Sequence, residues 1–329
     1  MIHSTLEIQL GSPELWAISL VAVVALFGLD FVITRKPHEV SMKEAIGWSA
    51  FYIALPLAFG VWIWQAFGSE RGLEFYAGYL VEKSLSVDNL FVFMLLLGSF
   101  AVPRELQQRV LLIGVAGALV LRGVFIALGA AMLATFAWTF LLFGLILLAT
   151  AVKVLRDTLN PAEHEIHPND LRIVKLVRRF WPVSDGYRGT RMSVLEGGKR
   201  ALTPLALATL AILATDVVFA VDSVPAVYGI TGDPYLVFVT NAFALLGLRA
   251  LYFVLEGALS ALVHLGYGLA AILAFIGAKL VMHWAHGVWS WVPEIETLFS
   301  LGVIVGILAI VITTSLVANR RNADLPRRG

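Results

Sequence analysis

Long apolar segments recur along the chain, and they constrain its fold more than any other feature. Each segment has roughly the 20 apolar residues that a helix needs to cross the hydrocarbon core of a bilayer. We expect about nine spans, at about residues 14–34, 46–67, 73–99, 107–131, 134–155, 201–230, 235–257, 259–283 and 296–318. The expected fold class is therefore an all-α, polytopic membrane protein.

The composition excludes several other classes of protein. Of the 329 residues, 59% are hydrophobic and only 14% are charged, whereas about 25% of the residues in an ordinary soluble domain are charged. A soluble enzyme, a disordered protein and a nucleic-acid binder are all excluded, and the partners expected instead are membrane lipid and small ions.

The cations between the segments predict how the chain is oriented. With the N-terminus outside, the segments on the cytoplasmic side hold nineteen Lys and Arg residues, and those outside hold only Arg71. Such a bias places the C-terminus in the cytoplasm. The loop at 156–200 carries many of these cations, and its stretch 171–180 is basic and amphipathic, which indicates a surface helix at anionic lipid headgroups.

An internal repeat organises the middle of the chain. Both copies have a carboxylate, five further residues, an aspartate and a small polar residue; they are Glu82 to Asn89 and Asp216 to Ser223. Seven residues separate Gly114 from Arg122 in one half and Asn241 from Arg249 in the other. Each half then has three spans, and since three is odd, the second half is inverted in the membrane, as in many secondary transporters.

This repeat sets the expected organisation of the chain. It predicts an N-terminal two-span region, a first repeat, a basic cytoplasmic loop, a second repeat, and a last span with its tail; these are residues 1–72, 73–155, 156–200, 201–283 and 284–329.

The spans also contain charged side chains, which are costly in lipid. Each costs about 2.5–3.5 kcal/mol on insertion scales, so these groups must face one another, water or an ion. The carboxylates are Asp30, Glu82, Asp88, Asp216, Asp222 and Glu256; the cations are Lys83, Arg122, Arg249 and Lys279. The arginines either pair with acids and pin helices together or take part in function. The acidic excess requires protonation or a bound cation.

The two repeated aspartates have oxygen-rich surroundings. Asp88 precedes Asn89, and Asp222 precedes Ser223. Oxygen donors suit Mg²⁺, Ca²⁺ and Mn²⁺. The chain has no cysteine, which excludes thiolate ligands.

Helix geometry divides the repeated residues between two faces. Residues seven apart nearly share a face, so Glu82 and Asn89 line one wall, and Asp216 and Ser223 line another. Residues six apart lie about 120° apart, so the two aspartates reach the same cavity only if a helix opens. Pro225 removes a backbone donor and favours such a break.

Three motifs resemble signatures of the TerC/Alx family of bacterial integral membrane proteins. They are residues 78–93, residues 203–205 with 215–226, and residues 241–253. The resemblance implies manganese export across the bacterial cytoplasmic membrane. Leu213 departs from the pattern, since many members have glutamate there, and this puts a ligand role at that position in doubt. The name of the family refers to tellurium resistance, which is a phenotype rather than a substrate.

The resemblance also assigns roles to residues. It implies metal or proton sites at Glu82, Asp88, Asn89, Asp216, Asp222 and Ser223, with Asn241 as a partner. Gating, pairing or proton relay is expected of Asp30, Lys83, Arg122, Asn241, Arg249 and Glu256.

The sequence therefore predicts a secondary transporter that exports Mn²⁺, with protons as the counter-ion and no cofactor. No nucleotide-binding motif of the P-loop type is present. The alternatives are an exchanger for Ca²⁺ or another divalent cation, and a membrane-assembly factor that transports nothing. We expect no enzymatic activity, because the residues around Asp88 and Asp222 differ from the Tyr-Asp and Gly-x-Gly-Asp motifs of intramembrane aspartyl proteases. Ion selectivity and oligomeric state stay open.

Overall fold

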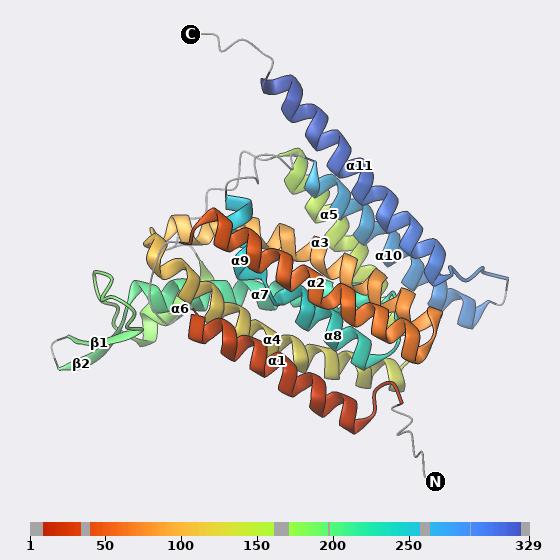
Figure 1. The fold of residues 1–329 in the computed structure, drawn as a ribbon, viewed down its shortest axis with the longest axis horizontal. Coiled ribbons are helices and arrows are strands. Elements are labelled where there is room, and N and C mark those ends of the chain that lie inside the picture. The colour runs from red at the N-terminus through yellow and green to blue at the C-terminus, as the bar shows by residue number, and fades with distance from the viewer. Residues whose placement is uncertain are drawn as a thin grey trace.

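The computed structural model describes residues 9–33, 40–160, 171–196, 198–256, 264–289 and 291–323. In these ranges the chain forms eleven helices and one two-stranded hairpin (Figure 1). The helices are α1 (Pro13–Ile33), α2 (Met42–Phe67), α3 (Ser69–Ser99), α4 (Arg104–Thr135), α5 (Thr139–Leu159), α6 (Arg172–Phe180), α7 (Pro204–Tyr228), α8 (Pro234–Leu245), α9 (Leu248–Glu256), α10 (Leu265–Val288) and α11 (Thr297–Ala323). The strands are β1 (Ser193–Glu196) and β2 (Lys199–Leu202), and they pair antiparallel.

The helices confirm a polytopic, all-α protein. Among the described residues, seven helices are long and apolar enough to cross a membrane, and they are α1, α2, α4, α5, α7, α10 and α11. The bent pair of α8 and α9 passes the same test as one unit, which raises the number to as many as eight. Helix α3 has 31 residues but carries charged side chains along its length. The count of nine spans and the inverted repeat stay predictions.

Local sequence explains where several of these helices begin. The Ser41 side chain accepts a hydrogen bond from the backbone of Glu44 and caps α2. Thr203 caps α7 and Asp233 caps α8, and each is followed directly by a proline at the first helical position. A side-chain oxygen at the N-cap accepts a hydrogen bond from a backbone N–H that has no partner in the helix. A proline at the first helical position costs no helical hydrogen bond, because the N–H that it lacks would have had no partner. Helix α7 therefore starts at Pro204, and the residues just before it, expected to be in the span, form β2.

The two halves of the chain pack against each other rather than separately. Helix α4 of the first half lies on α7 of the second, α3 lies on α8, and α5 lies on α10. If the two halves were exchanged, the α4–α7 contact would take the place of the α3–α8 contact and the reverse, and the α5–α10 contact would stay the same. Helices α1 and α11 lie on opposite outer sides of the bundle (Figure 1). The centre of the molecule is thus formed by α3, α4, α7 and α8.

The break in helical structure lies in a different helix from the one expected. Helix α7 is continuous to Tyr228, with Pro225 in its last turn, where the proline removes only one helical hydrogen bond. The expectation of an opening at Pro225 is wrong. The chain bends instead by 42° between α8 and α9, at Gly247, whose φ of 78° favours glycine.

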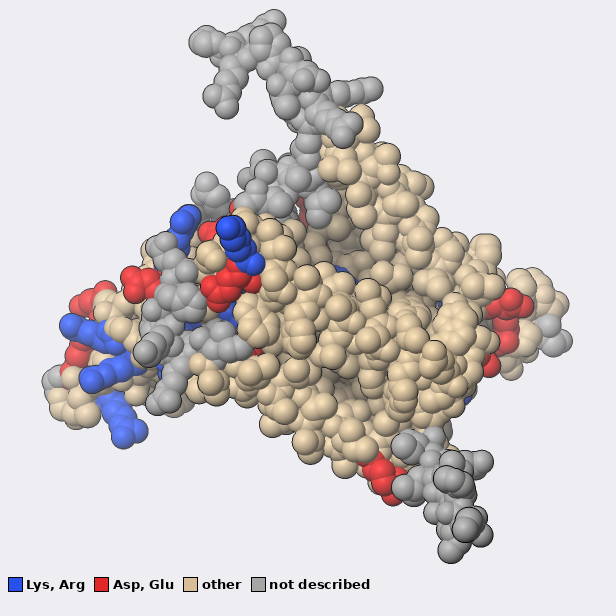
Figure 2. Space-filling view, in the orientation of Figure 1, with Lys and Arg blue, Asp and Glu red and all other residues tan. Residues whose placement is uncertain are grey.

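Charge is unevenly distributed over the surface. Figure 2 shows apolar and neutral residues over the middle of the visible face, and Lys and Arg gathered at the end where β1 and β2 lie. Helix α6 packs through Val174 and Val177 next to Leu207 of α7, and Leu176 is 53% exposed. Several cations of the orientation argument lie outside the described residues; they are Arg35, Lys36, Arg327 and Arg328.

A tyrosine ties the connection before the hairpin to the end of α3. The Tyr187 hydroxyl donates a hydrogen bond to the Phe100 carbonyl at 2.7 Å. Burial raises the pKa of Tyr187 to about 12, so this hydroxyl keeps its proton near neutral pH and remains a donor.

Candidate functional site

One arginine joins the four central helices. Arg122 of α4 is fully buried, and its guanidinium reaches acids on two neighbouring helices. Nε and Nη2 donate to the two carboxylate oxygens of Asp216 on α7, both at 3.1 Å. Nη1 donates to Glu82 Oε1 on α3 and, at 3.0 Å, to Asn241 Oδ1 on α8.

These charges lie deep within the fold. Glu82, Arg122 and Asp216 each lie near the middle of a long helix, and their side chains are at most 2% exposed. A buried charge is tolerated only when it is paired and hydrogen-bonded. The arginine therefore stabilises two carboxylates at once, and the structure confirms that it pairs with buried acids.

Oxygen atoms without partners lie beside this cluster. Glu82 Oε2, Ser86 Oγ and Ser223 Oγ are buried and make no hydrogen bond with the described part of the chain. Ser223 lies beside Glu82. All three residues are at most 1% exposed. Buried polar atoms nearly always have partners, so this group of orphaned oxygens indicates a place for a ligand.

Ser86 was missed by the sequence reasoning. It lies four residues after Glu82 on α3, so both side chains share one face of the helix. The four-residue spacing from Glu82 is the signal in the sequence that identifies Ser86, although Ser86 has no counterpart in the pattern that the two repeats share.

The repeated residues are buried as their spacing predicts. Asn89 and Ser223, each seven residues after a buried acid, are 5% and 1% exposed. Asp88 and Asp222 are only partly buried. Arg122 and Glu82 lie close enough to Asp222 to interact with it electrostatically.

Asp88 has a different environment. Its carboxylate has no hydrogen bond or ion pair with any residue that the structure describes. Among the same residues, no three His, Cys, Asp or Glu side chains converge as a ready metal site. The metal role of the predicted ligands stays a prediction.

A second buried ion pair lies toward α1. Arg249 of α9 donates to both carboxylate oxygens of Asp30 on α1, at 2.5 and 3.1 Å, and to Gln108 of α4 at 3.0 Å. Lys83 on α3 donates to the Ala244 carbonyl at 3.3 Å. The matched arginines of the two halves thus hold different sets of partners.

Glu256 was expected among the charges within the spans, and it lies at the very end of the bent pair α8 and α9. Its side chain is 37% exposed and lies 3.9 Å from Arg104, at the start of α4. Glu256 is the last residue of α9. Because Glu256 is partly exposed and has Arg104 nearby, it is not one of the buried charges of the interior.

Leu213 lies against α4. A methyl group added at Gly117 would come within 2.8 Å of its side chain. The position where many relatives have glutamate is here part of the α4–α7 contact.

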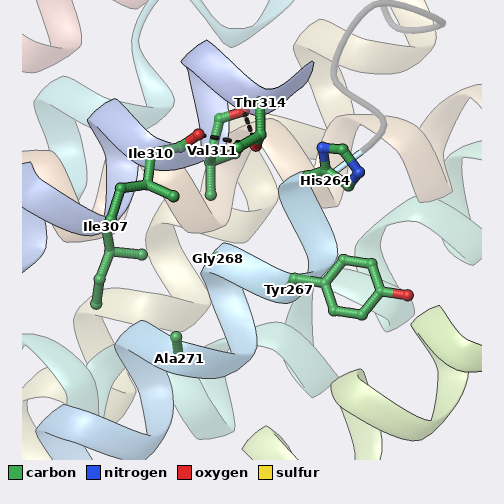
Figure 3. Close-up of a pocket in the computed structure, with 8 residues that line it drawn as sticks. All are labelled: His264, Tyr267, Gly268, Ala271, Ile307, Ile310, Val311 and Thr314. Atoms are coloured by element: carbon green, nitrogen blue, oxygen red, sulfur yellow. Dashed lines mark hydrogen bonds between the residues drawn. The ribbon is translucent and has the colours of Figure 1, made fainter. Parts of the chain in front are cut away.

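An apolar cavity of about 390 Å³ lies elsewhere, between α10 and α11. Figure 3 shows His264 and Gly268 on one helix opposite Ile307 and Val311 on the other. None of the predicted site residues lines it, so the cavity is separate from the acidic cluster.

The chain is similar to several known membrane proteins along most of its length. The profile described as integral membrane protein TerC family matches residues 67–323. An uncharacterized membrane protein of Myxococcus xanthus is 41% identical over 97% of this chain and 98% of its own length. One from Mycobacterium tuberculosis is 43% identical over 84% of this chain and 70% of its own length. No solved structure matches the chain.

A further relative carries a functional name. The protein Alx of Escherichia coli, whose name proposes a membrane-bound redox modulator, is 37% identical to this chain over 97% of it and 99% of its own length.

Proposed function

Because the chain belongs to the TerC family of integral membrane proteins, we propose that it is a secondary transporter that exports Mn²⁺ across the bacterial cytoplasmic membrane in exchange for protons. The chain is an integral membrane protein with several spans. We assign it no enzymatic activity and no cofactor.

One observation carries this proposal, namely a set of oxygen atoms on two facing helices that the described side chains leave partly without partners. Arg122 satisfies Asp216 and one oxygen of Glu82, and Arg249 satisfies Asp30. Glu82 Oε2, Ser86 Oγ and Ser223 Oγ have no partner among the described residues. The partly buried Asp88 and Asp222 lie on the same two helices, α3 and α7. Carboxylate and hydroxyl oxygens are ligands that a hard divalent ion accepts.

Proton exchange follows from the same groups. A buried carboxylate is stable when it binds either a proton or a cation, and it is costly when it binds neither. An ion that leaves Asp88 and Asp222 would therefore be replaced by protons. The inverted repeat predicted from the sequence would let the two halves rock about this site.

The alternatives differ in what the oxygen set does. A Ca²⁺ exchanger would use the same ligands, because Ca²⁺ also binds oxygen. A membrane-assembly factor would need no ion at all. A redox function based on thiol exchange has no residues to use, since the chain has no cysteine.

The test is Mn²⁺ efflux from proteoliposomes that contain the purified chain. We expect Asp88→Asn and Asp222→Asn each to lower the efflux rate by about tenfold or more, because a ligand worth about 1.4 kcal/mol changes binding tenfold. Asp157→Asn makes the same change at an exposed position of α5 and should leave efflux intact. Wild-type rates in both interior variants would contradict the proposal, and competition by Ca²⁺ would identify the alternative substrate.

A further inference from the structure

The two acids held by Arg122 are not bound in the same way. Asp216 receives two parallel hydrogen bonds, both at 3.1 Å, through Nε and Nη2. Glu82 receives a single contact, from Nη1 to Oε1. A two-point fork fixes a guanidinium in place more firmly than one hydrogen bond does. Asp216 is thus the anchor of Arg122, and Glu82 is the partner that can be released at lower cost.

Glu82 also faces two ways. Its Oε1 contacts Arg122, and its Oε2 has no hydrogen bond with the described residues. Ser223 lies beside the same carboxylate. Ser86 Oγ and Ser223 Oγ lack partners as well. The carboxylate therefore lies between a cation that belongs to the chain and a group of oxygens that could bind another cation.

The Arg122 side chain has a second acceptor to retain. Nη1 also donates to Asn241 Oδ1 at 3.0 Å. If Glu82 turned away, Arg122 would keep both oxygens of Asp216 and the amide oxygen of Asn241. No buried guanidinium nitrogen would then be left without an acceptor, which removes most of the penalty for breaking a buried pair.

We propose that Arg122 is a tethered competitor of the transported cation, and that Glu82 passes between Arg122 and the ion. In the present state the arginine neutralises Glu82. When a divalent ion enters beside Ser86, Ser223 and Asp222, it withdraws Glu82 from Arg122. Repulsion between the guanidinium and the ion limits affinity, so the site can release the ion as well as bind it. The inference rests on the proposed function, since it assumes that the cargo is a divalent cation.

Arg249 offers a matched comparison. It occupies the equivalent position in the second half, is 3% exposed and also holds a buried aspartate. Its network contains Asp30 and Gln108. Losing either arginine removes one buried cation, but only the loss of Arg122 frees Glu82.

The experiment measures how Mn²⁺ shifts the unfolding temperature of the purified full chain in detergent. The nine tryptophans give the signal. A ligand that binds only the folded state raises this temperature according to its concentration and affinity. For Arg122→Gln we expect a larger rise than in the wild type, equivalent to an apparent Kd about tenfold lower, or about 1.4 kcal/mol. Adding Glu82→Gln to that variant should abolish the gain.

The control variant is Arg249→Gln, whose rise with Mn²⁺ should equal that of the wild type. A rise in Arg122→Gln no larger than in the wild type would overturn the inference, as would an equal gain in Arg249→Gln. If Arg122→Gln does not fold, Arg122→Lys decides instead. Lysine keeps the charge but cannot make the two-point contact of the guanidinium. We therefore expect a rise with Mn²⁺ that is larger than in the wild type but smaller than that expected for Arg122→Gln. A rise no larger than in the wild type would overturn the inference.

A different measurement tests the proposed function itself. A wild-type chain that gives no Mn²⁺ efflux in proteoliposomes contradicts transport. The competition between Arg122 and the ion is still decided by the unfolding temperatures alone.

Discussion

Arg122 and Arg249 have the same place in the two halves of the chain, yet only one of them bridges the halves through carboxylates. Arg122 holds Glu82 and Asp216, the matched acids of the repeat. Arg249 holds Asp30, which belongs to the N-terminal region. Sequence similarity thus predicted which residues are buried and charged, but it did not predict which acid each arginine contacts.

The pair of Asp30 and Arg249 gives a test at this scale. Asp30→Asn leaves a buried arginine without its counter-charge, and we expect the free energy of unfolding to fall by about 3–5 kcal/mol. Replacing both partners by Asp30→Leu and Arg249→Met should recover most of that loss, because no uncompensated charge remains. Unfolding titrations in mixed detergent measure both effects.

An exposed pair serves as the control for this test. Arg188 and Glu196 lie 3.5 Å apart and are 61% and 42% exposed. Glu196→Gln should change the free energy of unfolding by no more than about 1 kcal/mol. If Asp30→Asn were equally mild, the buried pair would not be stabilising α1 against α9.

Spacing along a helix explains how much of the site was predictable. The seven-residue spacing correctly placed Asn89 and Ser223 on the buried faces that hold Glu82 and Asp216. Ser86 was missed because a serine in an apolar span is common and carries no charge. Its importance appears only when the absence of a partner for its hydroxyl is known.

At the scale of helices, α5 and α10 approach so closely that their backbones nearly touch at two glycines. A methyl group added at Gly144 would lie 2.8 Å from the Gly277 carbonyl, and one added at Gly277 would lie 3.0 Å from the Gly144 carbonyl. Small residues allow membrane helices to approach in this way. The contact joins the third helix of each half.

We expect Gly277→Leu to separate these helices and lower the free energy of unfolding by about 1–3 kcal/mol, as overpacking commonly does. Gly302→Ala is the control, because nothing lies within 4 Å of the added methyl group and alanine favours a helix interior by about 0.5–1 kcal/mol. Thermal unfolding in detergent compares the two. Equal stability of Gly277→Leu and the wild type would show that α5 and α10 can move apart freely.

The bend between α8 and α9 shows what the sequence did not reveal at this scale. Proline is the usual signal of a helix break, and Pro225 was given that role. Its position in the last turn of α7 makes it harmless. Gly247 gave no such signal in the sequence, because a single glycine indicates a bend only when its backbone conformation is known.

At the scale of the whole molecule, Lys and Arg gather at the end that carries the hairpin (Figure 2). This agrees with the predicted bias, but it does not say which side of the membrane that end faces. The lengths of the apolar segments predicted the membrane class and most of the helices. The contacts between halves could not be predicted, because they depend on packing between residues far apart in the chain.

Cysteine labelling tests the orientation directly, since the chain has no cysteine of its own. Ser69 at the start of α3 and Ser193 in β1 are both exposed. The cells are first stripped of their outer membrane, and the cytoplasmic membrane is kept intact. An impermeant maleimide should then react with Ser69→Cys at once and with Ser193→Cys only after lysis. The reverse pattern would contradict an external N-terminus.

The bend at Gly247 has a mechanical consequence. Asn241 lies six residues before it on α8 and holds Arg122, and Arg249 lies two residues after it on α9 and holds Asp30. A methyl group at Gly247 would lie 2.3 Å from Tyr52 Cβ, so α2 presses against the joint. The two short helices therefore form two arms on either side of a joint that is braced by α2. Because α2 holds the joint in place, each arm keeps its own charged cluster, and a rearrangement around Arg122 can stay confined to the arm that carries Asn241.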